Sequence, residues 1–91
     1  MGKCILIIGV RRQCYKAAIE LGHKVVLWSD GELNEKRKKK LFGWIEEPYS
    51  ESSKELSEKV IRELEKYKIQ RVIANTEETV ILGARARKHL K

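Results

Sequence analysis

Two short segments combine helix starts with residue types that favour an anion. In Gly9–Gln13, Arg11 and Arg12 follow a glycine that ends an apolar run. Asn75–Glu78 likewise lies between an apolar run and a helical pattern. Backbone N–H groups and the helix dipole favour an anion at a helix N-terminus, and the arginines add charge of the right sign. One interpretation is that the two segments converge at one edge of a sheet and bind an anion there. The other is that Gly9 only makes a tight turn and both arginines are solvated.

Dinucleotide binding is the alternative that the glycine suggests. Gly9 follows an apolar run, and Asp30 comes 21 residues later, near the usual spacing for a carboxylate that binds a ribose. However, Arg11 and Cys14 stand where the motif has its second and third glycines. Side chains there keep the backbone away from a pyrophosphate and obstruct helix–strand packing. The sequence therefore disfavours NAD binding.

Other catalytic chemistry has less support. Cys14 near a helix start could act as a nucleophile, but a small buried hydrophobe is favoured because no histidine lies near it in sequence. Glu77 and Glu78 could form an acid–base pair, yet acidic residues are favoured in a first helical turn by the dipole alone. No set of His, Cys, Asp or Glu has the spacing of metal ligands. We therefore predict no catalytic residue and no metal site.

Apolar periodicity predicts the elements that position these segments. β-Branched and apolar runs predict strands, whereas apolar stripes at helical spacing predict helices. Strands are expected at 3–9, 25–28, 41–45 and 71–74, and helices at 12–21, from a Ser52–Glu55 capping box to Tyr67, and from Asn75 or Thr76 to about His89. The segment 30–40 is predicted to be a polar connection. Right-handed crossovers then favour an α/β, Rossmann-like three-layer fold with a four-stranded, mainly parallel sheet in the order 3-2-1-4.

Composition limits the class of protein. The chain has 91 residues, which predicts one domain over 1–91. Hydrophobic residues make up 42%, arranged in periodic blocks, so a disordered chain is not expected. The longest apolar run, Cys4–Val10, is far shorter than a bilayer span, and no export leader is recognised. We therefore expect a cytoplasmic protein that has no membrane partner.

The net charge of +7 is concentrated in a few places, above all in the run Lys36–Lys40. Such a run can bind phosphates in a salt-sensitive way. No aromatic or glycine-rich nucleic-acid motif is interleaved with it, which favours a solvated loop. Nucleic acid is therefore not the expected partner, although a basic nucleic-acid-binding domain stays as an alternative function.

The sequence resembles one known family over essentially its whole length. The matching patterns are ILIIG at 5–9, AAIELGHKVVLW at 17–28, EEPYS at 46–50 and KIQRVIANTEETVILGARARKHL at 68–90. They are similar to the N-terminal (pre-ATP-grasp) domain of ATP-grasp ligases, which include the carbamoyl-phosphate synthase-like and amino-acid ligase-like carboxylate–amine ligases. The basic insertion 34–40 departs from the compact loops of that family.

The resemblance implies that different domains of one polypeptide bind ATP and contact the substrate. ATP and Mg²⁺ would be held by later ATP-grasp domains of the same polypeptide, and the first domain would lend loops to the substrate cleft while being inactive alone. By position, Gly9, Arg11, Arg12, Thr76 and Glu77 would face that cleft. No cofactor is expected within this chain.

An isolated domain of this kind would expose the apolar face that its partner domains cover. Trp28, Phe42 and Trp44 are the candidates for this patch. Exposed apolar surface favours association, so a homo-oligomer is a further expectation.

Overall fold

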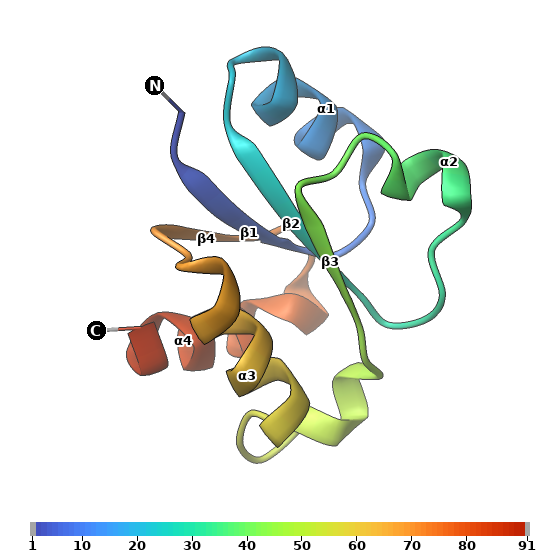
Figure 1. The fold of residues 1–91 in the computed structure, drawn as a ribbon. Coiled ribbons are helices and arrows are strands. Elements are labelled where there is room, and N and C mark those ends of the chain that lie inside the picture. Colours follow the sequence, from blue (N-terminus) through green and yellow to red (C-terminus); the bar gives the residue numbers. More distant parts are fainter. Residues whose placement is uncertain (1, 91) are drawn as a thin grey trace.

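Four short strands lie side by side in the computed structural model, which describes residues 2–90. They are β1 (Cys4–Ile8), β2 (Lys24–Ser29), β3 (Gly43–Glu46) and β4 (Arg71–Ala74). Every neighbouring pair is parallel, and the order is β3-β2-β1-β4 (Figure 1). The predicted α/β fold and strand order are therefore confirmed, with a sheet that is wholly parallel.

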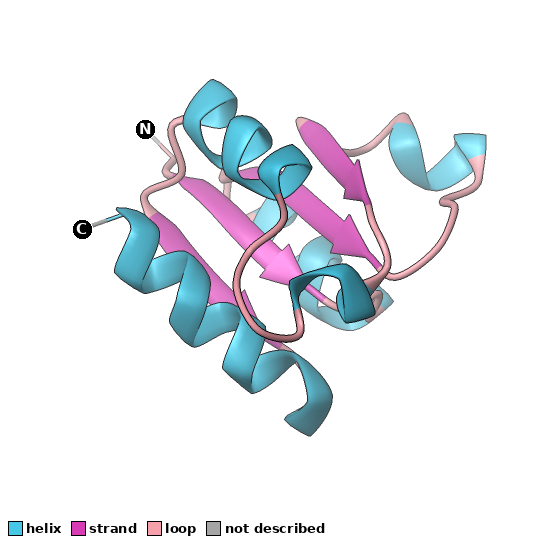
Figure 2. Cartoon of the chain, turned by 90° about the horizontal axis from the view of Figure 1, so that it is seen from below, coloured by secondary structure: helices cyan, strands magenta, loops and turns pink. Residues whose placement is uncertain are grey.

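Helices cover both faces of the sheet. α1 (Arg12–Glu20) lies on one face, whereas α3 (Glu58–Tyr67) and α4 (Glu77–Leu90) lie on the other (Figure 1). In Figure 2, which looks onto that second face, α3 and α4 lie in front of the strands. No helix within residues 2–90 is long and apolar enough to cross a membrane.

The core has two layers because side chains of β1 and β2 alternate between the faces. All five residues of β1 are buried, as expected for a parallel strand covered on both sides. On the α1 side the buried residues are Ile5, Ile7, Tyr15, Ala18, Val25, Leu27, Leu33 and Leu41. On the other side they include Leu6, Ile8, Val26, Trp28, Ile45, Val60, Leu64, Leu82 and Ala86. Trp28 is fully buried, so its prediction as an exposed residue is wrong.

The polar connection contains one helical turn that apolar periodicity could not predict. α2 (Glu35–Lys38) begins after Asn34, whose Oδ1 accepts a hydrogen bond from Arg37 N at 2.8 Å. Glu46 of β3 holds this segment, because its carboxylate accepts a hydrogen bond from Leu33 N at 2.7 Å and pairs with Lys38 Nζ at 3.4 Å. A cap and two polar contacts, and no apolar stripe, define this turn.

The start of α3 lies later than predicted. Ser52 belongs to a 3₁₀ helix, η1 (Tyr49–Ser52), and the capping box predicted from Ser52 and Glu55 is absent. The N-cap of α3 is Ser57, whose Oγ accepts a hydrogen bond from Val60 N at 3.3 Å. Ser52 is buried, and its Oγ accepts a hydrogen bond from Ser57 N at 3.1 Å. It therefore supports the cap from one turn upstream.

Candidate functional site

The two segments predicted to converge do meet, at the carboxyl ends of β1 and β4. Asn75 Nδ2 donates a hydrogen bond to Gly9 O at 2.9 Å, and Asn75 N donates to Ile8 O at 3.1 Å. The order of the strands reverses at this point, which is where ligands bind in open parallel sheets. The structure therefore places Gly9 and the segment 75–77 at one site.

Gly9 has a structural reason to be glycine. Its φ is +107°, and a Cβ there would lie 3.4 Å from Asn75 Cβ and 3.8 Å from Thr79 Cγ2. Its N–H donates to Trp28 O at 3.0 Å, which ties the turn to β2. The tight-turn interpretation therefore accounts for this residue without a ligand.

The first side of the site is cationic. Arg11 is the N-cap residue of α1 in an extended conformation, and its side chain makes no capping hydrogen bond. Arg11 and Arg12 are both exposed, and neither forms an ion pair with an acidic residue among those that the structure describes. The first turn of α1 contains no acidic residue. The positive end of its dipole therefore faces solvent together with two guanidinium groups.

The second side of the site is acidic. Thr76 and Glu77 are exposed at the start of α4, and both Glu77 and Glu78 lie in its first turn. The fully buried Thr79 fixes this start, since its Oγ1 accepts a hydrogen bond from Thr76 N at 3.0 Å. α4 begins at Glu77, directly after Thr76, which is one of the two starts that the sequence left open.

Asp30 has a structural contact at the start of η1. Its Oδ1 accepts a hydrogen bond from Tyr49 N at 2.7 Å at the start of η1. The loop after β1 carries Arg11 and Cys14 at the positions of the missing glycines, and Cys14 lies half-buried within α1. No group of three potential metal ligands occurs in the described part of the chain.

Sequence reasoning missed a polar and aromatic cluster beside this site. Trp28 Nε1 donates a hydrogen bond to Glu47 O at 2.9 Å, and the Trp28 and Tyr49 rings meet edge to face at 5.8 Å. Burial, followed by the charges of Asp30 and Glu78, raises the pKa of Tyr49 to about 12. Only the fold joins these residues, because they come from β2, η1 and α4 and share no periodic pattern.

Comparisons with known proteins identify no relative of this chain. No protein-family model matches the chain, and neither the curated proteins nor the solved structures contain a significant match.

Proposed function

We propose that this chain is the substrate-side, scaffolding domain of an ATP-dependent carboxylate–amine ligase and is inactive alone. In this proposal ATP and Mg²⁺ are held by ATP-grasp domains of the same polypeptide, which activate a carboxylate as an acyl phosphate. The sequence resemblance suggests the family, and the parallel 3-2-1-4 sheet is compatible with it.

The observation that carries the proposal is the bond between Asn75 Nδ2 and Gly9 O at 2.9 Å. It joins the two loops while the side chains of Arg11, Thr76 and Glu77 stay exposed. Loops joined in this way, with exposed polar side chains, suit positioning of a substrate that another domain activates.

The charges at this edge suit the two functional groups of such a reaction. Arg11 and Arg12 can bind a carboxylate or phosphate through charge-assisted hydrogen bonds, and Glu77 can bind an ammonium group. Exposed apolar side chains lie beside them, namely Val10, Val80 and Ile81, at 41%, 54% and 59% exposure. They provide surface against which a following domain can pack.

The first test measures substrate kinetics in the native polypeptide that carries this domain. We expect Arg11→Ala to raise KM for the carboxylate substrate about tenfold, since a hydrogen bond to a charged group contributes about 1.5–3 kcal/mol, and to leave KM for ATP within about twofold. Arg62→Ala is the matched control, because Arg62 is an exposed arginine on α3. An Arg11 variant that changes only KM for ATP contradicts the proposal.

The purified chain 1–91 provides a second test. Isothermal titration with ATP and Mg²⁺ is expected to show no magnesium-dependent affinity in the micromolar range and no hydrolysis. Micromolar, magnesium-dependent binding that Arg11→Ala removes would place the nucleotide on this domain and refute the proposal. A native polypeptide without any ATP-binding domain would refute it as well.

A further inference from the structure

A cavity of about 610 Å³ lies at the amino ends of the strands, away from the site proposed above. We name it the lysine–aromatic cleft after the residues that give its chemistry, Lys24, Phe42, Lys66, Tyr67 and Lys68; Gly2, Cys4 and Gln70 complete its lining. The volume falls within the range of about 300–1,000 Å³ that is usual for ligand pockets.

Two aromatic rings form one wall of the cleft. The Phe42 and Tyr67 rings meet edge to face at 6.0 Å, and Phe42 is 51% exposed. Gly43 makes room for this arrangement, because a Cβ at that position would overlap the Tyr67 ring. The glycine that interrupts the apolar pattern of β3 therefore fixes an aromatic ring of the cleft.

The charged groups of the cleft are all cationic. Lys24 Nζ lies 5.0 Å from the Phe42 ring centroid, and Lys66 Nζ lies 5.2 Å from that of Tyr67. No carboxylate lines the cavity. Within residues 2–90, Lys24 and Lys68 form no ion pair. Lys66 Nζ also lies 4.0 Å from Glu63 Oε2. The Lys24 and Lys68 ammonium groups in the same cleft as the two rings are suited to an anion that carries planar rings.

The same chemistry continues along the edge strand β3. Phe42 and Trp44 are paired in register with Val25 and Leu27, so both rings lie on the α1 face of the sheet, about 7 Å apart along the strand. Trp44 is 37% exposed, and Lys38 Nζ lies 5.3 Å from its ring centroid.

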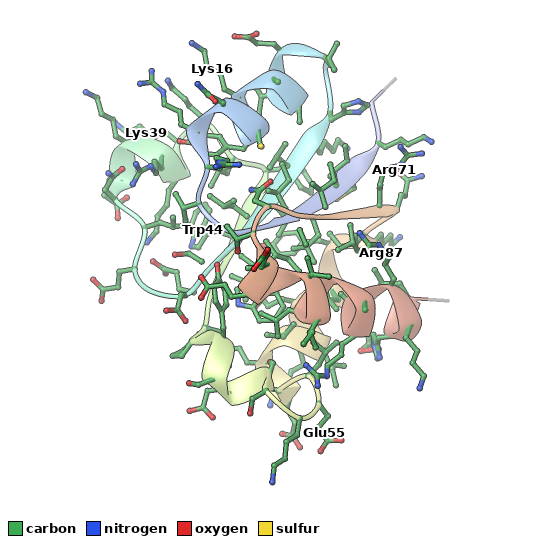
Figure 3. The ribbon with its side chains drawn as sticks, turned by 180° about the vertical axis from the view of Figure 1, so that it is seen from behind. Lys16, Lys39, Trp44, Glu55, Arg71 and Arg87 are labelled. Atoms are coloured by element: carbon green, nitrogen blue, oxygen red, sulfur yellow. The ribbon has the colours of Figure 1, made fainter. Side chains whose placement is uncertain are left out.

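The basic run lies beside this strip. Lys38 of the run lies over the Trp44 ring, and Figure 3 shows the labelled Lys16 of α1 and Lys39 after α2 on the same side of the molecule. Lys36, Lys39 and Lys40 are exposed. The sequence of Lys36–Lys40 contains no aromatic residue, and this argued against a nucleic-acid partner. The fold places the aromatic ring of Trp44 beside the run.

We propose that the lysine–aromatic cleft and the adjoining strip at Trp44 bind single-stranded nucleic acid. Unpaired bases would stack on Phe42, Tyr67 and Trp44 while lysines contact the phosphates, which is how proteins bind single strands without reading their sequence. A duplex hides the faces of its bases from these rings. A second copy of this chain is a poor occupant, because two surfaces rich in lysine repel each other.

The test is fluorescence anisotropy of a labelled twelve-residue thymidine oligonucleotide with the full chain, in low salt of about 50 mM. We expect Phe42→Ala to weaken binding about tenfold because one stacking surface is lost, and Phe42→Trp to restore it. An abasic oligonucleotide of equal length should bind far more weakly, since it has phosphates but no bases. Quenching of tryptophan fluorescence should come from Trp44, because Trp28 is buried.

A charge-matched pair of variants tests the lysines. Lys24→Gln with Lys68→Gln should weaken binding about tenfold and make it less sensitive to salt, because fewer counterions are released. Lys54→Gln with Lys88→Gln removes the same charge at a different cavity and should leave affinity within about twofold. Thermal melts check that each variant is folded.

Several results would overturn the inference. One is no anisotropy change at about 100 μM protein, which is the weak end of non-specific affinities. Another is equal affinity for the thymidine probe and for an abasic or duplex probe. The last two are an equal loss of affinity in both pairs of lysine variants, and a folded Phe42→Ala protein that binds as tightly as the original chain.

Discussion

At the scale of single residues, backbone conformation decides what each of three glycines does. Gly9 and Gly22 have positive φ values of +107° and +88°, and an added Cβ would meet only ordinary van der Waals contacts at Gly9 and no atom within 4 Å at Gly22. Gly31 has open space without a positive φ. Backbone conformation therefore distinguishes the first two positions from the third. A side chain is costly where φ is positive, because L-residues rarely adopt that conformation.

Gly→Ala substitutions at these positions should lower stability to different extents in urea unfolding. We expect Gly9→Ala and Gly22→Ala each to lower the free energy of unfolding by about 1–3 kcal/mol, and Gly31→Ala by less than about 0.5 kcal/mol. If Gly9→Ala costs no more than Gly31→Ala, the turn after β1 does not have the positive φ described above.

At the scale of elements, helix starts depend on side-chain caps that other parts of the fold select. The sequence contains serines at 50, 52, 53 and 57 ahead of the apolar stripe of α3. Burial of Ser52 leaves Ser57 as the cap, with hydrogen bonds running from Val60 N to Ser57 Oγ and from Ser57 N to Ser52 Oγ. A local pattern could not choose among these serines, because the choice depends on which of them the core buries.

Ser57→Ala and Glu55→Ala distinguish the observed cap from the predicted one. Ser57→Ala should lower the free energy of unfolding by about 1 kcal/mol because the Val60 N–H loses its acceptor. Glu55 is exposed, so Glu55→Ala should change it by less than about 0.5 kcal/mol. Chemical denaturation measures both, and a larger loss in the Glu55 variant would favour the capping box at Ser52.

At the scale of the whole molecule, Tyr49 connects three parts of the carboxyl edge. Its ring packs on Trp28 of β2, its N–H binds Asp30, and the charge of Glu78 on α4 acts on its hydroxyl group. Burial is the largest cause that raises its pKa from 10.0 to about 12. The hydroxyl group is therefore favoured in its neutral form by the folded protein as a whole.

This pKa predicts a stability change in alkali. Between about pH 10 and 12 the unfolded chain loses the Tyr49 proton while the folded protein keeps it, so this contribution to stability is complete below pH 10 and is lost as pH rises through that window. Tyr49→Phe should unfold with a weaker pH dependence there. The measurement is the free energy of unfolding in urea of both proteins at pH 9 and pH 11. Lysines that titrate in this range are the same in both proteins, so their effect cancels. An identical change in free energy between the two pH values would contradict the raised pKa of Tyr49.

Hydrophobic pattern and chain order were enough to determine the fold class, the four strands and their order. The reason is that apolar periodicity and right-handed crossovers act locally or between consecutive elements. The run from Cys4 to Ile8 predicted a strand buried on both faces, and it is one. The convergence of Gly9–Gln13 with Asn75–Glu78 followed from the same topology.

Only the tertiary structure decided the features that depend on distant partners. These are the turn α2 held by Glu46, the engagement of Asp30 with Tyr49, the burial of Trp28, and the lysines placed beside Phe42 and Trp44. Each joins residues from different elements through polar or aromatic contacts, which leave no period in the sequence. The sequence pattern therefore determined the sheet and the helices that cover it. Tertiary packing decided which polar and aromatic side chains contact one another.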